Sequence, residues 1–295
     1  MTNSLPRILI TGGNGQLAQA LRQHALTNKF QLSFRSHAEM DISNLHSVTT
    51  VIKEFSPDAI INTAAYTAVD KAESDEDAAM QANYQGAKNL AIASHEAVVP
   101  LIHLSTDYVF DGEATIPYSE EALTNPINIY GKSKYLGEEA IREHCTQHII
   151  LRVSGVFSEF GNNFFKTILR LAAERNELRI VADQMTCPTD ANDIARVIFN
   201  LLAAEEKSFG TYHYCGKNAV SWHEFATAII SEAKKYKPLL VENIQAIPAS
   251  AYPTPARRPA YSVFNCKKIE NHFGITQTPL AASIQQVAAV LLQRS

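Results

Sequence analysis

The fold of this chain is most clearly indicated by the segment Ile8-Leu9-Ile10-Thr11-Gly12-Gly13-Asn14-Gly15-Gln16-Leu17-Ala18. A short apolar run leads directly into a glycine triplet, and a helical pattern follows. Gly12 permits a tight turn, and Gly15 lets the backbone approach a pyrophosphate at the N-terminus of the helix. A plain turn is the alternative, but a glycine loop between strand and helix at the start of a βαβ unit is typical of a dinucleotide-binding domain.

Short apolar runs alternate with helical patterns over the first 150 residues. Continuous apolar runs are typical of strands buried on both faces, and their alternation with helices requires parallel crossovers. The sequence therefore predicts an α/β fold, a Rossmann-type doubly wound parallel sheet. The predicted strands are 7–11, 31–35, 59–62, 101–105 and 149–153, and the predicted helices are 16–27, 48–55, 76–97 and 130–144.

The end of the second strand bears on the choice of cofactor. An acidic residue there would favour a free ribose 2′-hydroxyl, whereas this chain has Arg35 followed by Ser36 and His37. Because a cation can contact a 2′-phosphate, the sequence favours NADPH and leaves NADH open. Asp41 follows soon after and could contact the adenosine instead, and an exposed arginine at a strand end is also common without a ligand.

After about residue 155 the alternation loosens. We expect residues 1–154 to form an NADP-binding Rossmann domain, to which 190–214 return. Residues 155–189 and 215–295 are expected to form a smaller C-terminal substrate-binding lobe over the carboxyl ends of the strands. The helices expected in this half are 166–175, 191–204, 221–236 and 279–293, and the strands are 178–181 and 211–214.

Composition excludes several classes of protein. The 295 residues carry 26 Lys and Arg against 30 Asp and Glu, a net charge of −4, so no broad cationic field is available for nucleic acid or an anionic membrane. No apolar run approaches the ~18 residues of a membrane span, and the polar N-terminus does not resemble a signal peptide. The four cysteines are irregularly spaced, which predicts neither a metal site nor a disulfide framework and favours a cytoplasmic location.

Two motifs carry the predicted chemistry: Ser105-Thr106-Asp107-Tyr108 at the end of the fourth strand, and Tyr130-Gly131-Lys132-Ser133-Lys134 on a helix. Tyr130 and Lys134 are four residues apart and share one helix face. A free phenol has a pKa near ~10, and a neighbouring ammonium pulls that pKa toward neutrality. With Thr106 bonding the same substrate oxygen, these groups predict carbonyl reduction, with a hydride from nicotinamide and a proton from Tyr130. A solvated helix with an incidental Tyr and Lys is the alternative.

Together these motifs resemble the extended short-chain dehydrogenases/reductases and, more narrowly, the dTDP-4-dehydrorhamnose reductases, over nearly the whole chain. The segments Ala64–Glu73 (AAYTAVDKAE) and Thr254–Pro259 (TPARRP) are far more specific to that family than the glycine loop is. The resemblance implies NADPH-dependent reduction of dTDP-4-dehydro-6-deoxy-L-mannose to dTDP-L-rhamnose. Further matching segments are Asn62-Thr63 before the first of these, Gly161–Phe164 (GNNF), Asp183-Gln184 and Pro188-Thr189.

The resemblance also implies a role for individual residues. Tyr130 would be the proton donor, Lys134 its modulator and a ribose ligand, and Thr106 and Asp107 would contact the sugar. Asn163 and Arg258 are further substrate candidates, because an arginine suits a diphosphate by charge and geometry, although Arg258 could also be an exposed loop residue. The cofactor would lie on Gly15, Gln16 and Leu17 at the pyrophosphate, Asp41 and Ile42 at the adenosine, and Ala64, Ala65 and Tyr66 along its middle.

This chain departs from the family pattern at two positions. Gly155 stands where the family usually has an aromatic residue that packs on the sugar, and Phe157 or Phe160 could substitute for it. Ala20 stands where some members have a Glu in a magnesium-bridged dimer. We therefore expect no metal, and a monomer or weak homodimer.

Other functions stay open at this point. A non-catalytic NADP-binding subunit, resembling the regulatory subunit of methionine adenosyltransferase, gains weight from Gly155, but Thr106, Tyr130 and Lys134 weigh against it. A sugar-nucleotide 4,6-dehydratase would place an Asp-Glu pair after the threonine, whereas this chain has Asp107-Tyr108. Another nucleotide-sugar reductase or an epimerase is also possible.

Overall fold

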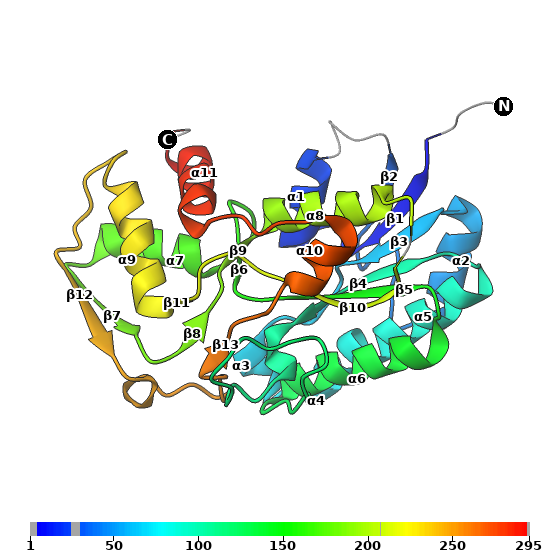
Figure 1. The fold of residues 1–295 in the computed structure, drawn as a ribbon, viewed down its shortest axis with the longest axis horizontal. Coiled ribbons are helices and arrows are strands. Elements are labelled where there is room, and N and C mark those ends of the chain that lie inside the picture. Colours follow the sequence, from blue (N-terminus) through cyan, green and yellow to red (C-terminus); the bar gives the residue numbers. More distant parts are fainter. Residues whose placement is uncertain (1–4, 25–29, 207, 294–295) are drawn as a thin grey trace.

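The computed structural model describes residues 5–24, 30–206 and 208–293 and is built around a six-stranded sheet (Figure 1). All neighbouring strands are parallel, in the order β10-β5-β4-β3-β1-β2. The strands are β1 (Arg7–Thr11), β2 (Gln31–Arg35), β3 (Ala59–Asn62), β4 (Leu101–Thr106), β5 (His148–Val153) and β10 (Gly210–Tyr214). Because β2 and β3 flank β1 on opposite sides, the topological switch point lies between β1 and β3. The predicted Rossmann-type parallel sheet is confirmed.

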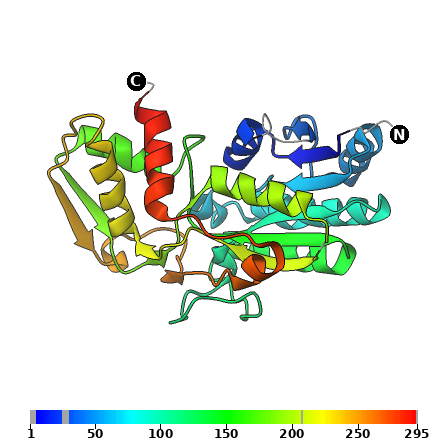
Figure 2. The ribbon, with the colours of Figure 1, turned by 45° about the horizontal axis from the view of Figure 1, so that its top comes forward.

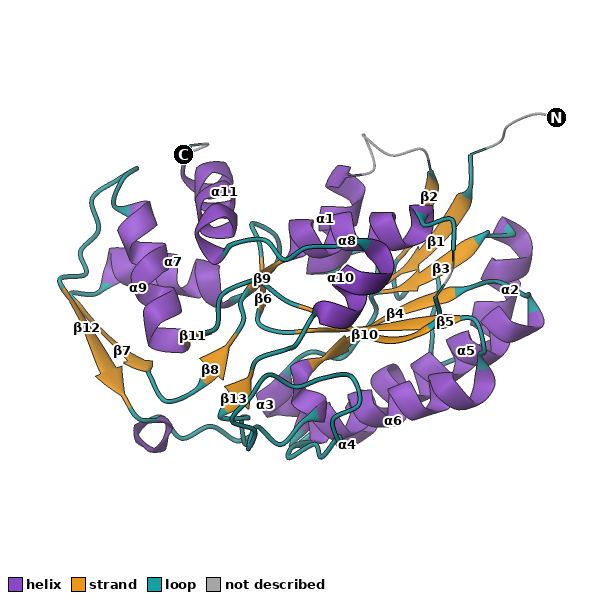
Figure 3. Ribbon diagram, viewed as in Figure 1, coloured by secondary structure: helices purple, strands orange, loops and turns teal. Residues whose placement is uncertain are grey.

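Helices cover both faces of this sheet (Figure 3). On one face α1 (Gln16–His24) packs against α8 (Ala191–Ala203), and on the other α5 (Gly86–Glu96) packs against α2 (Leu45–Phe55) and α6 (Ile129–His144). Each helical layer closes its own apolar core against the sheet. All four residues of β3 are buried, which explains its uninterrupted apolar sequence. Residues 25–27 of the helix predicted at 16–27 lie outside the described residues.

The helix predicted at 76–97 consists of three segments. α4 (Glu76–Met80) and α5 are joined by a π-helical turn, η2 (Gln81–Gln85). Asn83 within this turn accepts a hydrogen bond from the Tyr66 backbone N–H at 2.9 Å and donates to the Tyr66 carbonyl at 3.0 Å and to Ser133 Oγ at 2.9 Å. The extra residue of the π-turn thus ties the loop after β3 to α6. The loop itself contains the short helix α3 (Val69–Ala72).

The start of α6 is fixed by a cap and by close contact with the loop after β4. Asn128 is the N-cap, and its side chain accepts from the Gly131 backbone N–H at 2.7 Å. A Cβ at Gly131 would lie 2.1 Å from the Tyr108 carbonyl oxygen, so only glycine permits this approach. The 3-10 turn η3 (Asp107–Val109) therefore lies directly against the first turn of α6, which carries Tyr130.

A smaller lobe lies at one end of the sheet (Figure 2). In it α7 (Phe164–Glu174), α9 (Trp222–Ala233) and α11 (Leu280–Leu292) close a core with the parallel pair β7 (Glu177–Val181) and β12 (Asn243–Ile247). The sequence analysis predicted these helices and β7 but not β12. Five two-residue strands were also unpredicted: β6 (Val156–Phe157), β8 (Met185–Thr186), β9 (Thr189–Asp190), β11 (Val220–Ser221) and β13 (Tyr261–Ser262). The 3-10 turn η4 (Ala249–Ala251) follows β12.

Residues 263–275 differ from the predicted division of the chain. This segment was expected in the lobe, but Val263, Phe264 and Ile269 pack into the core that β10 and α8 share. It contains α10 (Lys267–Phe273), a helix too short to show a clear apolar period in the sequence. Across the described ranges, no helix is long and apolar enough to cross a membrane, and no group of three or more His, Cys, Asp or Glu is arranged to hold a metal. The four cysteines are free and buried.

Candidate functional site

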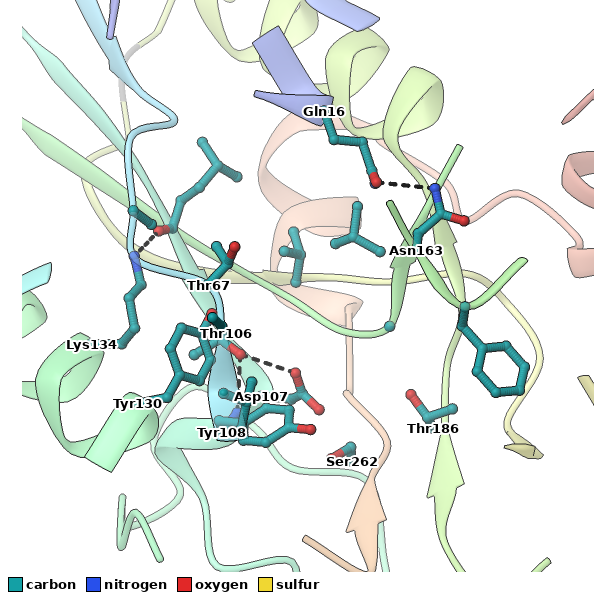
Figure 4. Close-up of a pocket in the computed structure, with 18 of the residues that line it drawn as sticks. Gln16, Thr67, Thr106, Asp107, Tyr108, Tyr130, Lys134, Asn163, Thr186 and Ser262 are labelled. Atoms are coloured by element: carbon teal, nitrogen blue, oxygen red, sulfur yellow. Dashed lines mark hydrogen bonds between the residues drawn. The ribbon is translucent and has the colours of Figure 1, made fainter. Parts of the chain in front are cut away.

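A cavity of about 1030 Å³ lies at the carboxyl ends of the central strands, between the sheet and the lobe (Figure 4). This edge is where open parallel sheets bind ligands. Ten of the predicted site residues line it: Gly15, Gln16, Leu17, Ala65, Thr106, Asp107, Tyr130, Lys134, Asn163 and Arg258. Other lining residues include Thr67, Tyr108, Gly155, Phe164, Gln184, Thr186, Trp222 and Ser262. The structure thus brings the predicted catalytic residues and the glycine loop to one cavity.

Gly12 and Ala64 lie against each other beside this cavity. Gly12 has a φ of +65°, and a Cβ there would lie 2.7 Å from the backbone N and Cα of Ala64. Glycine is therefore required at the turn. A Cβ at Gly15 would lie 3.1 Å from the Gly12 carbonyl oxygen, so the loop is compact before α1 begins at Gln16. This cradle at a helix N-terminus fits the pyrophosphate of a dinucleotide.

The other predicted cofactor residues are not among the residues that line the cavity. The Arg35 carbonyl accepts from the Gly13 backbone N–H at 2.8 Å, which places the end of β2 beside the glycine loop. Asp41 accepts from the backbone and hydroxyl of Ser43, at 3.0 and 2.8 Å. Ile42 is buried, and its carbonyl accepts from the Asn89 side chain at 2.9 Å. Tyr66 donates its hydroxyl to Asp75 at 3.2 Å.

Thr106 and Asp107 form a buried pair at the end of β4. The Thr106 hydroxyl donates to Asp107 Oδ1 at 3.1 Å and accepts from the Tyr108 backbone N–H at 3.2 Å. Burial raises the pKa of Asp107 to about 6, although hydrogen bonds with Ser262, Thr106 and Ser154 favour its ionised form. Asp107 therefore exchanges a proton close to neutral pH.

The Tyr130 phenol is buried beside this pair, and its ring meets the Tyr108 ring edge-on at 5.5 Å between centroids. Burial raises the pKa of Tyr130 well above its usual value, while a hydrogen bond with the Thr106 side chain lowers it. Tyr130 is consequently a protonated phenol at neutral pH. That protonation state suits a donor of a proton to a developing alkoxide.

Lys134 lies one helical turn further along α6, and its side-chain nitrogen Nζ is held on β4. Nζ donates to the Leu104 carbonyl at 2.5 Å and lies 3.1 Å from His103 Nε2. Burial lowers the pKa of Lys134 to about 8, against the opposing effect of the Glu138 charge. The spacing of Tyr130 and Lys134 in the sequence predicted that the charge of Lys134 would act on Tyr130. In the structure, Thr106 is instead the side chain whose hydrogen bond lowers the pKa of that phenol.

Asn163 and Arg258 reach the cavity from the lobe. Asn163 Nδ2 donates to Gln16 Oε1 at 3.1 Å, so the N-cap of α7 touches the first residue of α1. Arg258 forms an ion pair with Asp70 at 2.8 Å and donates to the Tyr108 hydroxyl at 3.1 Å. Both side chains therefore connect the lobe to the sheet domain across the cavity.

The aromatic residues of the cavity are not those that the sequence analysis expected. Phe157 is buried in the lobe core, stacked on Phe165 at 5.5 Å, and neither it nor Phe160 lines the cavity. Phe164 and Trp222 line it instead, with ring centroids 4.7 Å apart. Trp222 shares a helix face with the core residue Phe225, a spacing that by itself predicts packing in the core. The sequence carries no signal that separates the two roles, because β11, which ends directly before Trp222, is only two residues long and was not predicted.

Gly155 itself lines the cavity with a φ of +56°, in the left-handed region that favours glycine. A Cβ there would lie 3.0 Å from Thr186 Oγ1 and 3.2 Å from Pro188 Cα. The backbone at this position thus suits glycine and leaves little room for an aromatic side chain.

Comparisons with known proteins show which sequences and folds this chain resembles. The profile of the RmlD substrate binding domain family matches residues 6–293. A dTDP-4-dehydrorhamnose reductase of Aggregatibacter actinomycetemcomitans is 40% identical over 291 residues, covering 97% of this chain and 99% of the relative. The structure of a dTDP-4-dehydrorhamnose reductase from Clostridium acetobutylicum ATCC 824 is similar with a TM-score of 0.91 at 34% identity, covering 97% of this chain and 99% of that one.

A second solved relative carries a ligand. The dTDP-4-dehydrorhamnose reductase of Bacillus anthracis str. Ames, in complex with NADP, is similar with a TM-score of 0.90 at 36% identity, covering 96% of this chain and 98% of that chain. Sequence and structure agree over nearly the full length of each relative. The chain therefore belongs to the RmlD family, the family of the dTDP-4-dehydrorhamnose reductases to which it is similar.

Proposed function

We propose that this protein is an NADPH-dependent oxidoreductase that reduces dTDP-4-dehydro-6-deoxy-L-mannose to dTDP-L-rhamnose in the cytoplasm. Its relatives carry the name of this reaction, and one of them was solved with NADP. The observation that carries the proposal is the single cavity that Thr106, Tyr130 and Lys134 share with the glycine loop. The loop that would bind the dinucleotide and the proposed proton donor Tyr130 therefore face the same cavity.

In the proposed reaction the carbonyl oxygen at C4 of the sugar lies against Tyr130 and Thr106. When bound, the nicotinamide supplies the hydride for C4. Tyr130 donates its phenolic proton to the alkoxide that develops at that oxygen, and Thr106 orients the oxygen. Because both groups are buried and held by η3 and α6 before the substrate arrives, little reorganisation is needed. Lys134 would lower the cost of forming the phenolate once its ammonium lies beside Tyr130.

The residues that would hold the dinucleotide extend from the cavity to the end of β2. Gly12, Gly15, Gln16 and Leu17 would bind the pyrophosphate with backbone N–H groups at the start of α1. Arg35, beside the loop at the end of β2, would meet a 2′-phosphate, and Lys134 would contact the nicotinamide ribose. The adenosine side would lie on Asp41 and Ile42, and the middle on Ala64, Ala65 and Tyr66.

The lobe would hold the nucleotide sugar. Arg258 would exchange Asp70 for the diphosphate, which satisfies the guanidinium with an oxyanion of the same geometry. Asp107 and Asn163 would contact the sugar. Phe164 and Trp222 would provide the apolar surface that Gly155 does not supply.

A second candidate is a non-catalytic binding subunit that acts through a partner. Gly155 favours it, because the side chain that the family usually places on the sugar is missing. The buried Thr106–Tyr130 arrangement weighs against it, since binding alone does not require a protonated phenol in the cavity.

The test is oxidation of NADPH and, separately, of NADH by the purified chain, with dTDP-4-dehydro-6-deoxy-L-mannose generated in situ. Turnover that falls at least ~100-fold in Tyr130→Phe, with NADPH binding retained, is the expected result. Tyr108→Phe is the matched control, because that phenol contacts Arg258 rather than Thr106. NADPH binding without any turnover by the wild type would instead support the binding subunit. Near-full turnover by Tyr130→Phe would remove Tyr130 from its proposed role.

A further inference from the structure

His103 is a buried histidine on β4 that connects Lys134 on α6 to Asn62 on the neighbouring strand β3. Its Nδ1 lies 2.8 Å from Asn62 Nδ2 at the end of β3, and its Nε2 lies 3.1 Å from Lys134 Nζ. Asn62 and His103 are 1% exposed and Lys134 is 2% exposed. Buried polar groups at these distances must match donors with acceptors, so the hydrogen bonds can be assigned one after another.

The orientation of the Asn62 amide follows from its other contacts. The Ala64 backbone N–H lies 3.1 Å from Asn62 Oδ1, and the Thr11 hydroxyl donates to the same atom at 2.6 Å. A backbone N–H can only donate, so the atom that faces it is the amide oxygen. Asn62 Nδ2 is therefore the group that faces His103, and it donates to Nδ1.

The tautomer of His103 follows in turn. Burial, and then the charge of Lys134, lowers the pKa of His103 well below its usual value, so the ring is neutral. With Nδ1 accepting from Asn62, the single ring proton is on Nε2. That N–H points at Lys134 Nζ. An ammonium there would set donor against donor, whereas a free amine accepts from His103 and still donates to the Leu104 carbonyl.

We propose that Asn62 and His103 are positioning residues that hold Lys134 on β4 and favour its free amine over its ammonium form in the cofactor-free protein. The inference rests on the proposed function only for its consequence, because Lys134 must leave this site to act as an ammonium beside Tyr130. A proton from solvent in the cavity would accompany that movement. Asn62 and His103 would thereby disfavour the ammonium form of Lys134 on β4, so that this form is favoured beside Tyr130 when the cofactor is bound.

Other titratable groups near Lys134 do not account for this state. Glu138 on α6 favours the ammonium, but its own carboxylate is paired with Arg152 and Arg142. Tyr130 on the same helix is a neutral phenol. His148 on β5 also acts on His103 and lowers its pKa, which keeps the ring neutral. The hydrogen-bond chain from β3 is thus the arrangement that favours the amine.

The first test reads the tautomer directly. Nitrogen-15 NMR of the cofactor-free chain distinguishes a proton on Nε2 from one on Nδ1, and His103→Asn identifies the signal. A neutral Nε2–H tautomer that persists from pH 5 to pH 8 is expected. A ring protonated on Nδ1 would overturn the proposal.

The second test reverses the donor and acceptor roles along the hydrogen bonds that link Asn62, His103 and Lys134. In Asn62→Asp, a carboxylate still accepts from Thr11 and Ala64 but requires a proton on Nδ1 of His103, which leaves Nε2 as an acceptor for an ammonium. The pKa of Lys134, followed by the NMR shift of its Cε, should rise by at least one unit. His103→Asn, which keeps a group near Asn62 but removes the N–H facing Nζ, should also raise it. His103→Gln, which restores an amide N–H near that place, should leave the pKa close to that of the wild type.

An unchanged Lys134 pKa in Asn62→Asp and His103→Asn would contradict the proposal. Thermal melting of each variant confirms that the fold is retained. The titration uses neither cofactor nor substrate, so it separates this inference from the proposed function. Shifted pKa values without reductase turnover would refute the function alone, and turnover with unshifted values would refute only the positioning role.

Discussion

The carboxylate of Glu138 on α6 accepts two hydrogen bonds from the Arg152 guanidinium on β5, at 2.9 and 2.6 Å, and both side chains are buried. The same carboxylate accepts from Ser105 Oγ at 2.5 Å, one residue before Thr106 on β4. Glu138 lies one helical turn after Lys134. This pair therefore fixes the helix that carries Tyr130 and Lys134 to the two strands beneath it.

Replacing Glu138 by Gln should destabilise the protein strongly. Removal of one charge from a buried ion pair leaves the other uncompensated and typically costs ~3–5 kcal/mol in the free energy of unfolding. Urea denaturation measures this loss. Glu139→Gln is the matched control: it removes a half-exposed partner of Arg142 on the same helix and should change stability by less than ~1 kcal/mol. Equal losses in the two variants would show that the buried pair has no special role.

The ion pair between Glu138 and Arg152 should also contribute to the pH dependence of stability. Burial by itself raises the pKa of Glu138, but the charges of Arg152 and Arg142, with hydrogen bonds from Arg152 and Ser105, hold that pKa at about 2. Because the folded-state pKa is below the unfolded value of 4.5, the stabilisation is fully present above that value and is lost as the pH falls toward about 2. It amounts to something on the order of 3 kcal/mol. Denaturation at pH 6 and pH 3 should show the gap between wild type and Glu138→Gln narrowing at the lower pH, and a constant gap would be inconsistent with this assignment.

Asp107 should have the opposite effect on stability. Burial raises its pKa to about 6, so the stabilisation from its protonated form is present below the unfolded value of 3.8 and is lost as the pH rises through 6. Asp107→Asn removes the cost of the buried charge and should raise the melting temperature at pH 8 more than at pH 4. Its turnover should fall because Asp107 is a proposed sugar contact.

Asp111→Asn is the control for that prediction. Hydrogen bonds, chiefly from the Glu113 backbone N–H, lower the pKa of Asp111, so its ionised form stabilises the fold. This variant should lose stability at pH 8. Stabilisation of both variants, or of neither, would mean that the buried charge of Asp107 is not what limits stability at high pH.

Elements whose own residues carry a pattern could be predicted from the sequence. β1 and β3 have the predicted bounds, since strands buried on both faces are mainly apolar. β2, a partly buried edge strand, also has the predicted bounds. The π-turn at Gln81–Gln85 could not be predicted, because it depends on the bonds of Asn83 to Tyr66 and Ser133, distant in sequence. β12 and the two-residue strands depend likewise on their partners in the folded lobe.

The residues of the candidate site likewise fall into those that could be predicted from the sequence and those that could not. Thr106, Tyr130 and Lys134 lie in local motifs, at a strand end and on one helix face. Their presence in one site could therefore be predicted from the sequence, and all three line the cavity. Trp222 and Phe164 could not be predicted as cavity residues. They belong to lobe helices, and which face of such a helix meets the cavity is decided by how the lobe packs on the sheet.

Gly155 should tolerate an added side chain less well than another glycine of similar backbone conformation. Gly155 and Gly274 have similar positive φ angles, +56° and +65°, so a change to Ala at either position carries the left-handed cost of roughly 1–2 kcal/mol. A Cβ at Gly274 meets nothing within 4 Å, whereas at Gly155 it meets Thr186 Oγ1 at 3.0 Å. Gly155→Ala should therefore lose more stability than Gly274→Ala, by about 1 kcal/mol in urea denaturation.

A larger loss at Gly155 would show that this wall of the cavity has no room for a side chain. The substrate surface would then have to come from Phe164 and Trp222, and Trp222→Ala should raise the KM for the nucleotide sugar more than it changes kcat. Equal losses at the two glycines would show that Thr186 yields to a new side chain. In that case a Gly155→Trp variant would add an aromatic contact with the sugar, and its KM should fall below that of the wild type.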